Sequence, residues 1–593
     1  MTQLPASSFA RNFDVVFRRE IMNRLSYYFN TFQQLQAPDL CVTIVHMESI
    51  KTLIPVSFSG DIDDSSAILD EYSKDTSLFS VRPELAVFPK TKEDVELVVS
   101  AVRESKDTHP TLSITGRSAG SDMSGGPLNE SIILSCTKYL NHFTLHAEAE
   151  ELETEPGVFY RDAELEMDKV DLEFASYPAS KSLAALGGMV MNNAGGEKTL
   201  RYGQTRDSVL SVDMTLSDGK TYTFGKISKD ELEKKKSQQD FEGEVYRRVF
   251  DLVEKNKAII KEHAPRTSKN SAGYALWRIW DGTNFDMSQL FVGSQGTLGM
   301  LVKAKLKLIK KKKAERLVAL FFKNWDSLPE VVNRLLPIGP ETLETFDDAT
   351  MKLGLRFMPE IAKKAGENVV RFALRFLPEA IIGARLLGIP KLIVLVSIAE
   401  DDDATADKKA QEVLEAVKGL PVIARKSPSP EDAEKYWVMR RESFNLLRQH
   451  VKDKRTAPFI DDFCILPKDM PQFLPKLLAI LKEYGIKANI AGHAGDGNYH
   501  VIPLMNIADP KERAKIPVVA DKVYGLITSF HGSITAEHND GIMRTPYLEK
   551  MFGPEMIELF QQVKNIFDPQ NIFNPGKKVG GTIEYMKNHL VSK

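Results

Sequence analysis

The chain has 593 residues, and because a single hydrophobic core stops growing near about 250 to 300 residues, two or three domains are expected. Lys and Arg total 78 against 81 Asp and Glu, and the net charge of -3 argues against a nucleic-acid partner held by bulk positive charge. Cys41, Cys136 and Cys464 are far apart in sequence, which excludes a disulfide framework and an iron–sulfur cluster on four local thiolates. With no signal peptide and no long apolar segment, the sequence predicts a cytoplasmic protein that does not span a membrane.

The first part of the chain reads as a helical extension followed by an α/β segment. Residues 1–55 form the predicted extension, since apolar residues recur at helical spacing across 12–36. A short strand is expected at 85–87 and a helix at 94–103. A further strand at 111–115 then leads into a glycine-rich loop.

That loop, residues 116–126, reads Gly-Arg-Ser-Ala-Gly-Ser-Asp-Met-Ser-Gly-Gly. Backbone amides in such a loop can approach a pyrophosphate closely, because glycine has no Cβ and tolerates positive φ. The motif is not G-x-G-x-x-G before a helix, so a Rossmann site is disfavoured, and a plain turn explains a lone glycine loop equally well. More glycine follows at 186–196, 201–207 and 291–299, which together suggest one extended cofactor groove.

These glycine segments, with Pro83 to Leu85 and Pro178, resemble the FAD-binding domain of the vanillyl-alcohol-oxidase (PCMH) type flavoproteins. The resemblance implies an α+β fold in which two subdomains, within 56–312, clasp FAD, with the first loop on the pyrophosphate. No His or Cys stands in that loop, so non-covalent FAD is expected. Gln295 replaces the Glu of many relatives, which keeps the loop shape and removes a charge. The residues expected to hold FAD are Gly116, Arg117, Ser118, Ala119, Gly120, Ser121, Gly125, Gly126, Pro178, Gly187, Gly188, Asn193, Gly195, Gly196, Tyr202, Gly203, Gly299 and Asn574.

A lysine run at 310–313 marks the expected end of this domain, since such runs are usually solvated surface or linker. Between 317 and 424, strand and helix patterns alternate as β-α-β units do, which predicts a ferredoxin-like antiparallel sheet. This sheet belongs to a substrate or cap domain at 313–540. Residues 541–593 are expected to return to the FAD-binding domain.

A basic, apolar, helix-prone insertion interrupts the cap domain at 351–390, with seven Lys or Arg and only three acids. Two interpretations stay open. The insertion can lie on an anionic bilayer, as a peripheral contact with the inner face of the cytoplasmic membrane. Alternatively, it packs on its own domain as an amphipathic helical pair. The nearby lysine run slightly favours the membrane.

Residues 491–500, Ala-Gly-His-Ala-Gly-Asp-Gly-Asn-Tyr-His, place His493 and His500 on either side of a glycine turn. The glycines make a helix improbable, so a strand or loop, a turn and a strand are predicted. With Glu537 further on, two imidazoles and a carboxylate can close a three-ligand divalent metal site, and the adjacent His538 remains free to accept a proton. The alternative is that these are ordinary polar turn residues.

Residues 437–576 resemble the C-terminal part of the flavin-linked D-lactate, glycolate and D-2-hydroxyglutarate dehydrogenases. The segment 536–546 is similar to the flavin portion of larger dehydrogenases that also carry iron–sulfur motifs, and those motifs are absent from this sequence. The resemblance implies a divalent metal, zinc by expectation, on His493, His500 and Glu537, with His538 beside the substrate hydroxyl. Arg440, the third residue after Trp437, is the candidate clamp for the substrate carboxylate; otherwise it is an exposed helix arginine.

The sequence therefore predicts an FAD-dependent dehydrogenase that oxidises a D-2-hydroxy acid, of the D-lactate or D-2-hydroxyglutarate type, to the 2-oxo acid. Hydride passes to flavin N5, His538 acts as base, and the electrons go on to quinone or another acceptor. One alternative is an FAD enzyme resembling alkylglycerone-phosphate synthases, which lack the full metal set. The other is a catalytically degenerate, membrane-associated flavoprotein.

Overall fold

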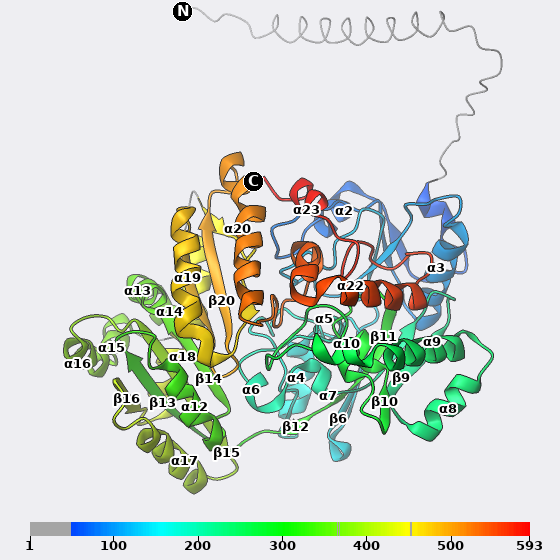
Figure 1. Cartoon of the computed structure of the whole chain (residues 1–593). Coiled ribbons are helices and arrows are strands. Elements are labelled where there is room, and N and C mark those ends of the chain that lie inside the picture. Colours follow the sequence, from blue (N-terminus) through cyan, green and yellow to red (C-terminus); the bar gives the residue numbers. More distant parts are fainter. Residues whose placement is uncertain (1–48, 365, 367, 451–453, 593) are drawn as a thin grey trace, which may run out of the picture. The chain divides into compact units, whose positions relative to one another are not determined.

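The computed structural model describes residues 49–364, 366, 368–450 and 454–592, shown in Figure 1. The helix expected at 12–36 lies outside the described residues, as does most of the extension at 1–55. Helices and three main sheets alternate through the remainder, and the α+β fold class is confirmed.

The first sheet has the strand order β1-β2-β4-β3 and carries the first glycine loop. Its strands β2, β4 and β3 run parallel, and β1 pairs antiparallel at the edge. Buried Val95, Val98 and Val102 recur on one face of α3, which packs against this sheet. The glycine loop begins in β3 and continues beyond its carboxyl end. The elements are β1 (Asp61–Asp63), β2 (Leu85–Phe88), α3 (Lys92–Ser105), β3 (Ile114–Arg117) and β4 (Ile132–Ser135).

The second sheet is antiparallel, with the order β10-β9-β8-β11-β6-β5. Its strands are β5 (Phe143–His146), β6 (Glu151–Thr154), β8 (Val209–Thr215), β9 (Thr221–Ser228), β10 (Asn284–Asp286) and β11 (Met300–Lys307). The lysine run follows β11. Within it Lys310, Lys311 and Lys312 form ion pairs with Glu150, Asp168 and Asp401, respectively. These lysines therefore join neighbouring segments of the fold.

The third sheet extends a ferredoxin-like core. Its order, β16-β13-β15-β14-β19-β20-β17, is antiparallel throughout, and β18 pairs with β20. α12 (Leu328–Leu335) connects the first two core strands in the chain, and α17 (Asp403–Ala416) the last two. The strands are β13 (Ala314–Phe322), β14 (Thr342–Asp347), β15 (Leu392–Glu400), β16 (Val422–Lys426), β17 (Arg455–Thr456), β18 (Phe463–Cys464), β19 (Lys487–His493) and β20 (Asn498–Met505). The predicted strand, turn and strand around the two histidines is confirmed.

The insertion between β14 and β15 is helical. It consists of α13 (Asp348–Arg356), α14 (Met358–Lys364), α15 (Val369–Leu374) and α16 (Leu377–Leu386). Phe357, Ile361, Phe372 and Phe376 are buried in a core shared with the third sheet and with α18 (Pro430–His450). One side of the insertion thus packs on its own domain.

The C-terminal segment runs back to the first sheet. After α22 (Leu548–Phe567), the amide of Ile114 donates to the carbonyl of Ile572 at 2.7 Å, and the amide of Asn574 donates to the carbonyl of Ile114 at 2.9 Å. The buried side chain of Asn574 also donates, through its Nδ2, to the carbonyls of Gly126 and Gln295. The chain end therefore supports two glycine segments. Among the described residues, no helix is long and apolar enough to cross a membrane.

Candidate active site

A cavity of about 570 Å³ lies between the glycine segments and the histidine hairpin. Its volume is within the range of small-molecule and cofactor sites, about 300 to 1,000 Å³. Glycine-rich segments line one end. The other end is lined by Arg440, Asp461, His493, His500, Glu537 and His538. A single cavity thus brings together residues that the sequence assigned to a cofactor and to a metal.

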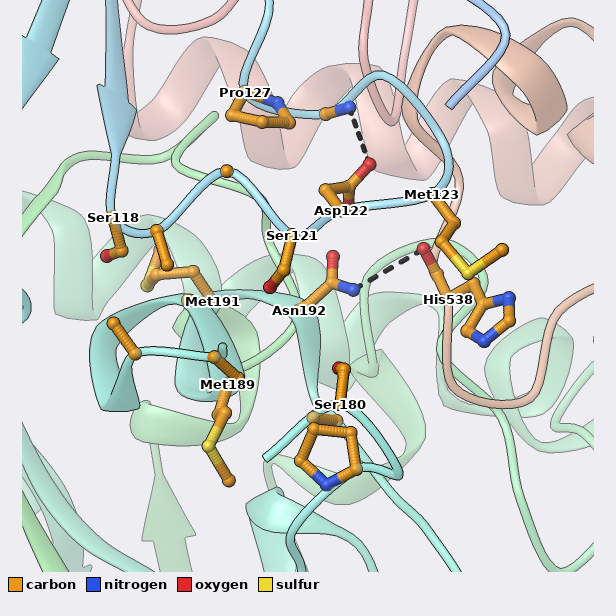
Figure 2. Close-up of a pocket in the computed structure, with 18 of the residues that line it drawn as sticks. Ser118, Ser121, Asp122, Met123, Pro127, Ser180, Met189, Met191, Asn192 and His538 are labelled. Atoms are coloured by element: carbon orange, nitrogen blue, oxygen red, sulfur yellow. Dashed lines mark hydrogen bonds between the residues drawn. The ribbon is translucent and has the colours of Figure 1, made fainter. Parts of the chain in front are cut away.

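The first glycine loop is shaped by one carboxylate. Asp122 Oδ1 accepts hydrogen bonds from the amides of Ser124 at 2.6 Å and Gly126 at 3.0 Å, and the second of these is drawn in Figure 2. Gly120 and Gly125 adopt φ values of 69° and 83°, which side chains rarely tolerate. The loop thus presents a backbone surface to the cavity, as a phosphate-binding loop requires.

Most of the residues assigned to FAD from the sequence line this cavity. Those that do are Gly116, Arg117, Ser118, Ala119, Gly120, Ser121, Gly126, Pro178, Gly187, Gly188, Gly195 and Gly299. Outside the lining lie Gly125, Asn193, Gly196, Tyr202, Gly203 and Asn574. Several of these shape the neighbouring backbone: Asn193 ends a helix with φ of 52°, and a Cβ at Gly196 would meet the Tyr177 carbonyl at 2.2 Å.

Gln295 uses its amide as a donor. Its Nε2 donates to Asn192 Oδ1 at 3.1 Å, to Ser124 Oγ at 3.2 Å and to Asp122 Oδ2 at 3.4 Å. Its Oε1 accepts from the Gly541 amide at 2.8 Å. An ionised glutamate cannot donate to these acceptors and would face the Asp122 carboxylate. Gln295, which stands where the family pattern has Glu, therefore fits the hydrogen bonds around it.

Sheet register brings the two histidines together. β19 and β20 pair Ala491 with His500 and His493 with Asn498, so His493 and His500 point to the same face of the hairpin. On the other side of β19, Glu344 of β14 is the direct register partner of His493. The turn between the strands packs closely on the segment that follows β18, since a Cβ at Gly497 would lie 1.8 Å from the Ile465 carbonyl.

Three potential ligand atoms converge at this point. His493 Nε2 lies 3.4 Å from His500 Nε2 and 3.5 Å from Glu537 Oε1, and His500 Nε2 lies 3.9 Å from Glu537 Oε2. On the opposite ring nitrogens, His493 Nδ1 bonds to Glu344 and His500 Nδ1 lies 3.0 Å from Asp461 Oδ1. Carboxylates behind metal-binding imidazoles are typical of zinc sites. The two-nitrogen, one-carboxylate donor set fits a divalent ion.

The two imidazoles have opposite pKa shifts. Burial, assisted by the charge of Lys269, holds the pKa of His493 well below its usual value. Burial alone would lower the pKa of His500 as well, but the facing Asp461 raises it to about 9. His493 is therefore neutral, as a metal ligand must be, whereas a metal at His500 would displace a proton.

A buried lysine neutralises the third ligand. Lys269 is fully buried, donates to Glu537 Oε1 at 2.7 Å and lies 3.2 Å from Asp496 Oδ2. Burial would raise the pKa of Glu537, but the positive charge of Lys269 lowers it below the usual value. Lys269 was not identified from the sequence, because a single lysine in a polar loop gives no signal.

His538 lies beside the histidine pair and close to the glycine segments. Its ring stacks on His500, with centroids 5.3 Å apart and planes at 25°. Its Nδ1 is 3.4 Å from Asp461 Oδ2, which is an ion-pair distance without hydrogen-bond geometry. The His538 carbonyl accepts from Asn192 Nδ2 at 3.4 Å, as Figure 2 shows. His538 thus lines the cavity and contacts both a hairpin histidine and a glycine segment.

Arg440 is only 8% exposed, so the alternative of an exposed helix arginine is wrong. It extends from α18 into the cavity lining, and its Nη2 lies 2.5 Å from Glu344 Oε2. Glu344 therefore holds both Arg440 and His493. The sequence offered one weak signal for such groups, the acids Asp461 and Asp462 inside the otherwise apolar stretch 459–465.

Asn498, in the same hairpin, holds a neighbouring segment of the chain in place. Its Nδ2 donates to Asp462 Oδ1 at 3.0 Å and to the Phe463 carbonyl at 3.1 Å. It is absent from the described lining of the cavity.

Two family models match the chain. An FAD binding domain matches residues 83–225, and the C-terminal domain of FAD linked oxidases matches residues 311–578. The matches include lining residues from both ends of the cavity, and the lining residues between 295 and 301 fall between the two matches.

Curated relatives have similar sequences at modest identity. D-2-hydroxyglutarate dehydrogenase of Escherichia coli (strain K12) is 25% identical over 552 residues, which cover 91% of this chain and 52% of that protein. This chain thus spans about half the length of that relative. D-lactate dehydrogenase of Archaeoglobus fulgidus is 26% identical over 501 residues, covering 84% of this chain and 91% of that protein.

The fold is also found among solved structures. p-Cresol methylhydroxylase with bound substrate matches with a TM-score of 0.61 at 14% identity, over 90% of this chain and 96% of that one. At this identity the match shows the fold alone, and it confirms the expected PCMH-type architecture.

Proposed function

We propose that the chain is an FAD-dependent dehydrogenase of D-2-hydroxy acids, since models of an FAD binding domain and of the C-terminal domain of FAD linked oxidases match it in this order. The product is the corresponding 2-oxo acid, and the flavin is held without a covalent bond. The main support is the single cavity, which has glycine backbone at one end and His493, His500, Glu537 and His538 at the other. D-Lactate and D-2-hydroxyglutarate are the first substrates to test, since they are in the names of the relatives.

The residues that would hold the two groups are those of the glycine segments for FAD and His493, His500 and Glu537 for zinc. The chemistry supplied there is hydride acceptance by the bound flavin and polarisation of the substrate hydroxyl by the bound ion.

His538 is the proposed acceptor of the hydroxyl proton. Its Nδ1 faces Asp461, which leaves Nε2 to take the proton. The Asp461 carboxylate then stabilises the imidazolium that forms, as carboxylates do behind other catalytic histidines.

Arg440 is the proposed clamp for the substrate carboxylate. A guanidinium can donate two parallel hydrogen bonds to a carboxylate, and Glu344 holds this one in place from behind. Arg440 is buried, which strengthens its electrostatic interaction with a bound substrate carboxylate. Alignment of the substrate is thus assigned to this chain's own side chains.

The test is to load the purified chain with FAD and zinc and to follow dye reduction with D-lactate, D-2-hydroxyglutarate, glycolate and, as a control for handedness, L-lactate. We expect at least one D-2-hydroxy acid to reduce the bound flavin. His538→Asn should keep FAD and metal but slow flavin reduction by about 10²- to 10⁴-fold, the usual contribution of a general base. If none of these acids reduces the flavin, the proposal is wrong.

We propose further that the electrons leave for a quinone or another external acceptor. We favour a lipid-soluble acceptor, because the helical insertion of the cap domain exposes an aliphatic surface.

A further inference from the structure

The helical insertion exposes an unusual amount of aliphatic surface. Eight of the 17 large hydrophobic side chains that are exposed in the described chain lie within residues 355–389. Scattered exposed hydrophobics are normal, but a concentration in one segment marks an interaction surface. We name these eight the aliphatic patch: Leu355, Val369, Val370, Leu374, Leu377, Ile381, Leu387 and Ile389.

Helical spacing puts patch residues on the outer faces of α15 and α16. In α16, Leu377 and Ile381 lie four residues apart and are more than half exposed, whereas Ile382 is buried. In α15, Val370 and Leu374 repeat this spacing on the outside. A helix that is apolar on both faces is normally covered on both.

Exposed bases accompany the patch. Arg356, Lys363, Arg371 and Arg385 are all exposed, and Glu360 is the exposed acid among the described residues of the insertion. The exposed charge is therefore predominantly positive. This combination of aliphatic side chains and bases suits the interface of an anionic bilayer, where the bases reach lipid headgroups.

The patch is rigidly anchored to the helix that carries Arg440. Buried Lys435 of α18 donates to Glu379 Oε2 of α16 at 3.1 Å and to the Arg375 carbonyl at 2.6 Å. The Tyr436 hydroxyl also donates to Glu379. In Figure 1, α15 and α16 lie at the outer edge of the cap domain, on the side away from α3.

We propose that the aliphatic patch docks on the surface of an anionic phospholipid bilayer. Aliphatic side chains with flanking bases favour this occupant, since protein interfaces are enriched in aromatic residues and the large exposed side chains here are Leu, Val and Ile. Docking would hold the cap domain at the bilayer surface, where a lipid-soluble acceptor dissolves. That link to the acceptor rests on the proposed function; the lipid contact itself does not.

The test uses the full FAD-loaded chain in flotation with vesicles of phosphatidylcholine, with or without phosphatidylglycerol. We expect at least tenfold stronger binding to the anionic vesicles. Leu377→Asp with Ile381→Asp should reduce that binding at least tenfold, and Arg371→Glu with Arg385→Glu should reduce it by at least about fivefold per charge. The matched control is Leu165→Asp with Leu478→Asp, two exposed leucines outside the patch.

FAD content and thermal unfolding establish that each variant is folded, independently of any activity. Equal binding to neutral and anionic vesicles would overturn the proposal, and so would unchanged binding by the Leu377 and Ile381 variant. Sedimentation that shows a dimer of the parent chain, lost in this variant, would assign the patch to a second copy instead. A failure to oxidise hydroxy acids would bear on the proposed function alone.

Discussion

The two ends of the cavity differ in what lines them: one is rich in glycine, and the other is lined by ionisable side chains. The flavin end is the part of the cavity lined by the glycine segments, where much of the lining is glycine and other small residues and Asp122 shapes the first loop. At the substrate end, ionisable side chains line the cavity, and each is held by a second charge: Glu344, Asp461 or Lys269. A site that binds its ligand through the backbone needs small residues, whereas a site that binds through ionisable side chains needs a partner of opposite charge for each of them.

The loop that carries Glu537 and His538 connects the two ends. Asn539 Nδ2 donates to the Gly293 carbonyl at 2.8 Å and to the Asn192 carbonyl at 3.0 Å. These bonds attach the loop directly to the glycine segments. The proton acceptor and the proposed flavin site are therefore held in a fixed relation, which hydride transfer requires.

The largest effect is expected for His500→Ala, which removes a proposed ligand from the substrate end. Turnover should fall on the order of 10⁴-fold, because the polarisation of the hydroxyl would be lost, while the flavin end stays intact. Turnover, FAD content and metal content of the purified variant are the measurements.

The control is His142→Ala, whose side chain is 82% exposed and outside the cavity lining. Loss of FAD together with activity would contradict the separation of the two ends. Full activity would make the hairpin histidines ordinary turn residues.

Lys269→Met tests how the charges at the substrate end are balanced. Removing this lysine leaves Glu537 and Asp496 without their buried cation, and the metal-free protein should lose about 3 to 5 kcal/mol of unfolding free energy. Added zinc should recover more stability in the variant than in the parent chain, since the ion supplies the missing positive charge.

The matched control is Lys435→Met, which breaks another fully buried ion pair, with Glu379, outside the cavity. It should be destabilised similarly but gain no more from zinc than the parent chain does. Equal gains from zinc in both variants would mean that Lys269 has no relation to the metal site.

The contrast between the two ends also explains what the sequence could predict. Glycine segments and the paired histidine motifs are local patterns, so the flavin groove, the hairpin and Glu537 with His538 were predicted from short stretches. Glu344, Asp461 and Lys269 were not predicted. Each has its partner far away in sequence, and only the register of β14 against β19 brings Glu344 to His493.

The fold shows the same division. Strands and helices of the ferredoxin-like core were predicted from their periodicity, because local patterns determine them. The attachment of the histidine hairpin to the edge of that core was not, since it depends on long-range pairing. The lysine run, predicted as solvated surface or linker, is partly exposed, and its pairing with Glu150, Asp168 and Asp401 depends on segments distant in sequence.

A smaller effect is expected for Asp461→Asn. This change removes the carboxylate behind His500 and His538, and such changes typically cost about 10- to 100-fold in metal affinity or activity. Metal affinity, measured by competition with a chelator, should fall within that range.

The neighbouring Asp462 provides the contrast. Its Oδ2 accepts from the amides of Ala536, Glu537 and His538, so Asp462→Asn should lower the free energy of unfolding before it affects intrinsic metal affinity. An unchanged metal affinity in Asp461→Asn would show that Asp461 does not support the metal site.

The smallest effect, and the sharpest test of the flavin end, comes from two adjacent glycines in α5 (Leu186–Asn192). A Cβ at Gly188 would lie 3.5 Å from the Ser118 Cβ, an ordinary contact, and would project into the cavity lining. Gly188→Ala should therefore fold as well as the parent chain, gaining up to about 1 kcal/mol from helix propensity. FAD affinity should nevertheless fall roughly tenfold, because the methyl group takes space needed by the flavin.

Gly187 is the matched control, since a Cβ there would lie 2.4 Å from the backbone of Pro156. Gly187→Ala should lower the unfolding temperature of the FAD-free chain, whereas Gly188→Ala should not. Two measurements are needed. The first is thermal unfolding of the FAD-free chain, and the second is a titration with FAD of chain that was unfolded to remove FAD and then refolded. Parent-like FAD affinity in Gly188→Ala would mean that this glycine serves the helix alone, and that the cofactor lies elsewhere in the cavity.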